Sequence, residues 1–207
     1  MPRVDDESFE RLLAGMKKAG GALNGADIPW ALGGGLAAWA RGGPETEHDV
    51  DLLVKPEDAE RAQQALAAAG MRTETPPEGW LLKAYTDDDV LVDLIFDPQG
   101  GPITDEILDR CEDLEVHAMR MKVVRLEDVL VQKVLALSEQ EPDFSSVLEL
   151  ARSLREQVEW SAVYERTKES PFGNAYFTLL DELGIVPQPS ASRTSAEARP
   201  SRAQSRR

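Results

Sequence analysis

The spacing of apolar residues changes once along this chain, and that change restricts the folds that the chain can adopt. Between residues 28 and 96, short apolar runs containing β-branched residues alternate with segments of helical spacing. From Leu126 onward the apolar spacing is almost purely helical. Strands and helices followed by helices alone predict an α+β fold, in which a core with strands precedes a C-terminal helical subdomain.

Glycines, prolines and apolar spacing place the individual elements. Strands are expected over residues 28–32, 49–54, 80–85 and 90–96, and helices over 9–20, 36–39, 57–69, 126–137, 147–154 and 171–183. Ser170 and Pro171 supply an N-cap and a first-turn proline for the last helix. Asp87-Asp88-Asp89 is typical of a tight turn, so the third and fourth strands should form an antiparallel hairpin.

Composition divides the chain of 207 residues into three parts. Residues 1–124 are expected to form the core and residues 125–186 the helical subdomain. Residues 187–207 are rich in Ser, Ala, Arg and Pro and have too little apolar surface to fold, so we expect a disordered basic tail. The tail carries +4 of an overall charge of −15, which leaves −19 on the rest. This negative charge disfavours non-specific binding to duplex DNA, because the DNA phosphates are negative as well.

Several classes of protein are disfavoured by what the sequence contains. Cys111 has no second cysteine with which to form a disulfide, and together with His48 and His117 it is too small a set for a zinc site. We expect structural roles for Cys111 and His117. His48 should point to the strand face opposite Asp49, where we expect either a structural role or an indirect one behind the acids. The N-terminus lacks a secretion signal, and the longest apolar run is far shorter than the roughly 20 residues that span a bilayer. These features predict a cytoplasmic protein without a membrane segment.

Two aspartates, Asp49 and Asp51, occupy alternate positions of a predicted buried strand and therefore share one face. Neighbouring buried carboxylates repel each other unless a cation binds between them, and Mg²⁺ prefers a few carboxylate oxygens together with waters and phosphates. Asp93 interrupts another apolar strand, where packing alone would select a hydrophobic residue. The three acids predict a metal site; solvated aspartates at a strand edge are the alternative.

Gly34 and Gly35 lie between a predicted strand and a predicted helix. Glycines there let the backbone approach a ligand closely, and amides at a helix start point toward anionic oxygens. The pair therefore indicates phosphate binding, or else simply a tight turn that requires positive φ.

The ordered combination of these motifs resembles the DNA polymerase β-like nucleotidyltransferase superfamily. Gly34-Gly35 is followed by thirteen residues, then by Asp49-Val50-Asp51-Leu52, and later by Asp93 within an apolar strand. The resemblance covers about residues 30–96. The helices after Leu126 look like the accessory bundle of a small bacterial branch that includes AbiEii-type toxin transferases.

This resemblance implies a mixed sheet with flanking helices and an enzyme that moves a nucleoside monophosphate from an NTP, such as ATP, to an acceptor hydroxyl with release of pyrophosphate. It implies that Asp49 and Asp51 hold two Mg²⁺ ions, and that Asp93 shares the catalytic metal and helps to deprotonate the acceptor. It also implies that Gly34 and Gly35 cradle the β- and γ-phosphates.

Three basic residues are further candidates. If the hairpin turn centres on Asp88, Lys83 lies opposite Asp93, where it would orient or deprotonate the acceptor; a charge-balancing strand pair is the alternative. Lys133 falls inside the apolar stripe of its helix, which favours either an anion such as a phosphate or a side chain that snorkels past the core. Arg41, at the end of the glycine-led helix, could reach the nucleotide or be an ordinary exposed arginine.

The acceptor is left open between two classes. A toxin-like enzyme would act on tRNA and have an antitoxin partner; the basic tail with Arg120, Lys122 and Arg125 favours it, and the acidic body opposes it. A polycationic small molecule, such as an aminoglycoside-like antibiotic, would be attracted to an acidic cleft. A non-catalytic module that binds nucleotide or metal is a third hypothesis.

Overall fold

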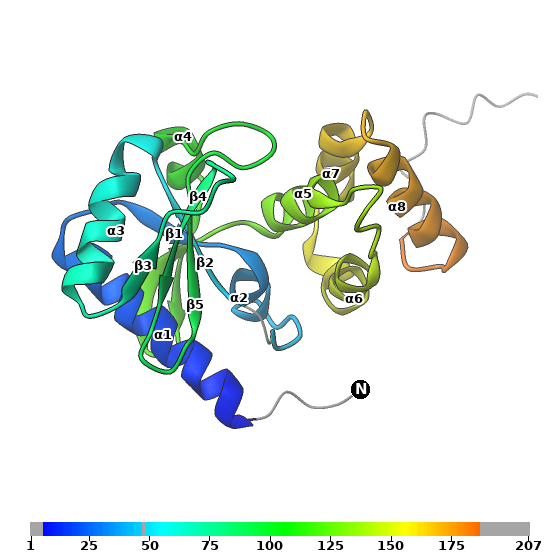
Figure 1. Ribbon diagram of the computed structural model, residues 1–207. Helices are drawn as coiled ribbons and strands as arrows, with labels where there is room; N and C mark the ends of the chain where they lie inside the picture. The colour runs from blue at the N-terminus through cyan, green and yellow to red at the C-terminus, as the bar shows by residue number, and fades with distance from the viewer. Residues whose placement is uncertain (1–5, 47–48, 187–207) are drawn as a thin grey trace, which may run out of the picture.

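The computed structural model describes residues 6–46 and 49–186 (Figure 1). His48 and the tail over 187–207, about which the sequence makes predictions, lie outside these ranges. None of the helices in the described ranges combines the length and apolarity that a membrane span requires.

The first part of the chain mixes strands with helices. Its elements are α1 (Asp6–Gly25), β1 (Trp30–Leu32), α2 (Gly34–Trp39), β2 (Val50–Val54), a 3₁₀ turn (Pro56–Asp58), α3 (Ala59–Ala68), β3 (Arg72–Glu74), β4 (Leu81–Tyr85), β5 (Leu91–Ile95), α4 (Asp105–Asp109), β6 (Glu112–Val116) and β7 (Met119–Val123). Every later described element is helical: α5 (Leu126–Ala136), α6 (Ser145–Leu154), a 3₁₀ turn (Arg155–Gln157), α7 (Trp160–Thr167) and α8 (Pro171–Glu182). The predicted α+β fold with helices after the sheet is confirmed.

The strands form one mixed sheet in the order β3-β4-β5-β2-β1-β7-β6. The β2–β5 and β1–β7 pairs are parallel, and the other neighbouring pairs are antiparallel. The two strands that carry the predicted acids, β2 and β5, are therefore direct neighbours near the middle of the sheet. This placement brings together residues that are far apart in the sequence.

Helices cover both faces of the sheet (Figure 1). On one face α1 and α3 pack against each other and against β5. On the other side α2 contacts both β2 and α5, and α5 in turn packs against α6, α7 and α8. Helix α5 thus connects the sheet-bearing part of the molecule with the remaining helices.

Helix α1 is longer than its glycines predict. The sequence suggests an end near Gly20, whereas the helix continues to Gly25. A Cβ atom at Gly20 would lie 2.7 Å from the Trp30 ring, so this glycine allows close packing of α1 on β1 and does not end the helix. Close approach, rather than a turn, explains the glycine.

Candidate active site

The three predicted acids converge at the centre of the sheet. Asp51 on β2 is in register with Asp93 on the neighbouring parallel strand β5, and Asp49 lies just before β2. One carboxylate oxygen from each of the three residues lies within 4.8 Å of the other two. The alternation of side chains along β2, read from the sequence, places Asp49 and Asp51 on one face.

The electrostatics of this cluster favour the binding of a cation. Burial, together with the nearby Asp49 carboxylate, raises the pKa of Asp51 to about 7 against the opposing effect of Lys133. Burial also raises the pKa of Asp93. The buried Oδ1 atom of Asp93 has the Lys83 ammonium as a charged neighbour, at 3.4 Å. Closely spaced oxygen donors and carboxylate repulsion both fit a hard divalent cation such as Mg²⁺.

Lys83 on β4 pairs in register with Asp93, as the turn at Asp88 predicts. Its Nζ atom lies 3.4 Å from Asp93 Oδ1, with the geometry of an ion pair. Burial lowers the pKa of Lys83, but attraction to Asp93 outweighs burial and the net pKa is raised. Lys83 is therefore an ammonium at neutral pH, which can orient an acceptor but has no free electron pair with which to take its proton.

The backbone around Gly34 is shaped to fit Asp51. Gly34 has φ of +54°, and a Cβ atom there would lie 1.6 Å from Asp51 Oδ2. The amide of Gly33 donates a hydrogen bond of 2.8 Å to the Asp51 carbonyl. Gly35 is also crowded, since a Cβ atom would lie 2.7 Å from the Thr46 hydroxyl oxygen. Both the conformation and the close approach at Gly34 require glycine.

A cavity of about 580 Å³ opens over Gly34, Asp49 and Asp51. Helix α5 forms one wall, where Lys133 projects among Val129, Gln132 and Ala136. The opposite wall comes from the ends of the β4–β5 hairpin and consists of Trp80, Ile95, Asp97, Pro98 and Gln99. The predicted placement of Lys133 on the apolar face of its helix thus brings it to the same cavity as the acids.

Sequence reasoning missed the residues of the hairpin wall. Asp97 follows Asp93 and Ile95 at alternate positions, so it could have been assigned to the same face of the strand. Trp80 is 38% exposed although it is large and apolar, and only the folded structure places it beside a cavity.

The structure does not bring Arg41 to this cavity. Its Nη2 atom lies 3.1 Å from Glu112 Oε2 and donates a hydrogen bond of 3.3 Å to the Val123 carbonyl. Arg41 lines a separate cavity of about 260 Å³ together with Glu112, Arg125 and Glu127. The helix end that carries Arg41 therefore points toward the β6 edge of the sheet and not toward the acids.

The other candidates have local roles. Cys111 is buried, and its thiol donates a hydrogen bond to the Ile107 carbonyl. His117 has φ of +48° in the turn between β6 and β7. Asp87, in the predicted turn, is exposed and forms an ion pair with Lys18.

Comparisons with known proteins agree with this geometry. A family model described as "Uncharacterised nucleotidyltransferase" matches residues 11–181. No curated protein gives a significant match. A solution structure of the antibiotic-resistance factor ANT(2'')-Ia is similar with a TM-score of 0.57 and 15% identity, covering 82% of this chain and 95% of that chain.

A crystal structure of ANT(2'')-Ia in complex with adenylyl-2''-tobramycin is similar with a TM-score of 0.57 and 16% identity, covering 78% of this chain and 96% of that chain. At such low identity these likenesses show the fold alone. They confirm the polymerase β-like nucleotidyltransferase fold, whereas the AbiEii-type branch stays a prediction. Because the family model matches most of its length, this chain belongs to that nucleotidyltransferase family and is a nucleotidyltransferase enzyme.

Proposed function

We propose that this enzyme uses Mg²⁺ to transfer a nucleoside monophosphate from an NTP to a hydroxyl group of a small, amine-bearing molecule. The observation that carries the proposal is the convergence of Asp49, Asp51 and Asp93, of which Asp49 and Asp51 line a cavity whose wall includes Lys133. Three acids close enough to share a cation, beside a cationic side chain suited to phosphate, form the minimum set for phosphoryl-group chemistry.

Asp49, Asp51 and Asp93 would hold two Mg²⁺ ions. When bound, Mg²⁺ neutralises the charge of the triphosphate and aligns it for an in-line displacement, an effect worth several kcal/mol. Lys133 adds a positive charge to the α5 wall, and Gly34 and Gly35 give the backbone room to approach the phosphates. The chain would thereby orient the β- and γ-phosphates away from the acceptor.

In the proposed reaction the acceptor oxygen forms a bond to the α-phosphorus. The bond from that phosphorus to the bridging β-phosphate oxygen breaks, and pyrophosphate leaves. Asp93 takes the hydroxyl proton as general base. The ammonium of Lys83 orients the acceptor oxygen and holds Asp93 in place.

The hairpin wall supports an amine-bearing acceptor. Asp97 lines the cavity, and the charge of Glu78 is close enough to raise the pKa of Asp93. The exposed ring of Trp80 adds an apolar surface beside these acids. Ammonium groups would be attracted to the carboxylates while the body of the molecule packs on the ring. The similar fold of ANT(2'')-Ia, a protein seen with adenylyl-2''-tobramycin, agrees with such an acceptor.

A tRNA acceptor finds less support. Lys122 and Arg125, which would have contributed positive surface, form ion pairs with Asp109 and Glu112 respectively. Arg120 lies opposite Glu115 in the β6–β7 hairpin. These basic groups are offset by neighbouring acids and so attract a polyanion weakly. A toxin role with an antitoxin partner would require the tRNA activity.

A transfer assay tests the proposal. Each of the four NTPs, labelled at the α-phosphate, is incubated with Mg²⁺ and either a panel of aminoglycoside-like amines or total tRNA. We expect label on an amine-bearing acceptor, and none with Asp49→Asn. Asp181→Asn, which makes the same change on the exposed face of α8, is the matched control and should retain transfer. Transfer to tRNA alone, or to neither class, would contradict the proposal.

A further inference from the structure

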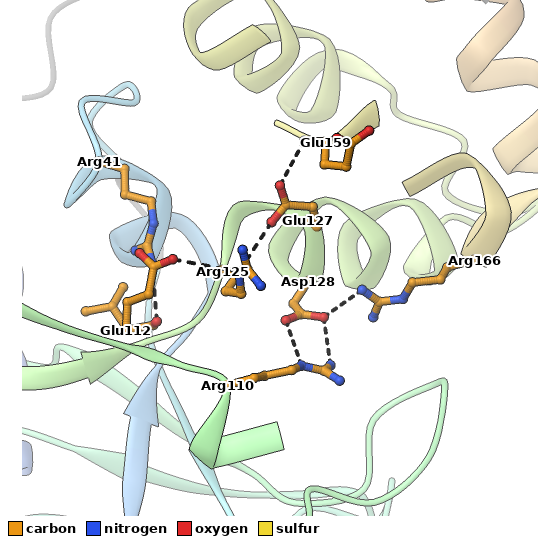
Figure 2. Close-up of polar contacts among 9 residues, drawn as sticks. Arg41, Arg110, Glu112, Arg125, Glu127, Asp128, Glu159 and Arg166 are labelled. Atoms are coloured by element: carbon orange, nitrogen blue, oxygen red, sulfur yellow. Dashed lines mark hydrogen bonds and ion pairs between the residues drawn. The ribbon is translucent and has the colours of Figure 1, made fainter. Parts of the chain in front are cut away.

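The buried carboxylate of Asp128 ties the sheet-bearing part of the molecule to helix α5. Asp128 lies in the first turn of α5, and its side chain is 7% exposed. Arg110, which follows α4, donates from Nε to Oδ2 over 3.1 Å and from Nη2 to Oδ1 over 2.8 Å. Arg166 on α7 donates from Nη1 to Oδ1 over 2.7 Å (Figure 2). One buried acid thus joins three separate parts of the chain.

The two arginines connect different parts of the molecule to α5. Arg110 belongs to the segment that enters β6, so its two parallel hydrogen bonds join the sheet to α5. Arg166 belongs to α7, which already packs against α5, so its bond lies within the helical part. A bidentate guanidinium–carboxylate pair fixes orientation as well as distance, because both bonds lie in one plane. Of the two arginines, Arg110 is therefore the one whose contact helps to fix how α5 sits on the sheet.

A second set of contacts lies beside this one (Figure 2). Arg125 Nε is 3.7 Å from Glu112 Oε1 and 3.9 Å from Glu127 Oε2. Glu112 also pairs with Arg41, and Glu127 Oε1 accepts a hydrogen bond of 2.8 Å from the Glu159 amide. These contacts surround the point at which the chain leaves β7 for α5. The junction is therefore held on its β6 side by charged groups.

The same helix forms a wall of the active-site cavity. Lys133 follows Asp128 by five residues, which corresponds to about 7.5 Å along a helix. Val129 and Gln132 line the cavity beside Lys133. A helix of this length moves as a rigid body, so a change of angle at Asp128 displaces the Lys133 side chain relative to Asp51. Asp51 and Lys133 line the same cavity, so this displacement changes the cavity's geometry.

We infer that Arg110 and Asp128 are positioning residues: their bidentate contact holds α5 at the angle that places Lys133 over the acidic cluster. The inference rests on the proposed role of Lys133 in holding the triphosphate. Neither Arg110 nor Asp128 lines the cavity, so their effect reaches the nucleotide through the helix. Loss of the contact should weaken nucleotide binding more than it slows the chemical step.

The test compares Arg110→Gln with Arg166→Gln. Both arginines have side chains that are 41% exposed, and both bind Asp128 Oδ1, so each variant removes one positive charge from the same carboxylate. We expect Arg110→Gln to raise the KM for the NTP about tenfold with kcat within about threefold, and Arg166→Gln to change KM by less than about threefold. Arg110→Lys, which keeps the charge but loses the bidentate geometry, should fall between them and also serves if Arg110→Gln folds poorly.

A second readout does not depend on catalysis. Spin labels at Glu60→Cys on α3 and Glu182→Cys on α8, both exposed positions, report the distance between the two parts of the molecule by electron resonance. We expect one narrow distance distribution, broadened by Arg110→Gln and unchanged by Arg166→Gln. Equal effects of the two variants on KM or on the distribution would overturn the inference. If the parent protein transfers no nucleotide, the proposed function fails, and the distance distributions alone decide whether Arg110 positions α5.

Discussion

Lys83 and Asp93 face each other across antiparallel strands β4 and β5, with 3.4 Å between the Lys83 ammonium and Asp93 Oδ1. Asp93 is in turn in register with Asp51 on β2, and Lys83 with Glu74 on β3. A row of four charged residues therefore crosses the sheet from β3 to β2: an acid, the lysine, and then two neighbouring acids. The ammonium neutralises one side of Asp93 and leaves the other side facing Asp51, where a metal is proposed to bind.

Removing the Lys83 ammonium should slow turnover and leave nucleotide affinity nearly unchanged. Lys83→Ala is expected to lower kcat roughly 10²-fold with KM for the NTP within about threefold, because the acceptor oxygen and Asp93 lose their orienting charge. Steady-state kinetics with saturating acceptor give both values. Lys18→Ala, which removes an ion pair with Asp87 at the far end of the same hairpin, is the control. If Lys83→Ala and Lys18→Ala have equal kcat and KM, Lys83 serves only to pair with Asp93 across the strands.

The metal-free protein should lose stability as the pH rises from about 4 to about 7. Asp51 titrates near 3.8 when unfolded and near 7 when folded, so the folded state holds its proton more tightly over that interval. Unfolding is then easier at neutral pH by up to about 4 kcal/mol. Asp93, whose pKa is also raised, contributes with the same sign. Denaturant titrations in EDTA at several pH values measure the effect.

Asp51→Asn is the matched variant for this experiment. It should flatten the pH dependence and make the metal-free protein more stable at pH 7.5. Adding Mg²⁺ at that pH should raise the melting temperature of the parent protein by about 5 °C and leave Asp51→Asn unaffected. A parent protein whose stability rises over the same pH interval would contradict the burial argument.

Gly34 should tolerate no side chain. Gly34→Ala forces a residue with a Cβ atom into the left-handed region and into Asp51 Oδ2, so we expect activity to fall at least about 100-fold and stability to fall by about 1–3 kcal/mol. In Gly21→Ala the new methyl group has no neighbour within 4 Å, and it should stabilise α1 by up to about 1 kcal/mol without loss of activity. Thermal melting and the transfer assay report both effects. An active Gly34→Ala enzyme would show that Asp51 does not need its observed position.

The Cys111 thiol should be unreactive in the folded protein. Burial, together with the nearby Asp128 carboxylate, raises its pKa to about 11, so only about one molecule in a thousand carries a thiolate at pH 8. Reaction with a disulfide reagent is expected to be slow in buffer and rapid in denaturant. Rapid labelling of the native protein would mean that the α4–β6 segment opens readily.

Local sequence patterns, namely apolar spacing, a helix cap and a turn, predicted much of this fold. Apolar spacing located the strands that became β1, β2, β4 and β5 and the helices that became α3, α5, α6 and α8. Ser170 caps α8 by accepting a hydrogen bond from the Gly173 amide, as the Ser-Pro pair predicts. The turn at Asp88 fixed the register of Lys83 against Asp93, because a tight hairpin leaves one pairing of its strands.

Strands β6 and β7 were not predicted. They alternate charged and apolar residues, but they are joined through His117 and Ala118, which both have positive φ. A turn of this kind normally shows glycine or asparagine, so the turn that pairs these strands has no sign in the sequence. The position of Arg41 depends on Glu112 of β6 and Val123 of β7, which come close to it only in the folded chain. The hairpin wall of the cavity was missed because tertiary packing, rather than spacing, exposes Trp80.

The central claim is that Asp49, Asp51 and Asp93 together hold divalent metal beside the nucleotide. Titration of the protein with Mn²⁺, followed by electron paramagnetic resonance in the presence of a non-hydrolysable NTP analogue, tests it most directly. We predict saturable binding in the parent protein and in Asp181→Asn, and affinity lower by roughly a hundredfold or more in Asp51→Asn. Equal Mn²⁺ affinity in the parent protein and Asp51→Asn would contradict the account.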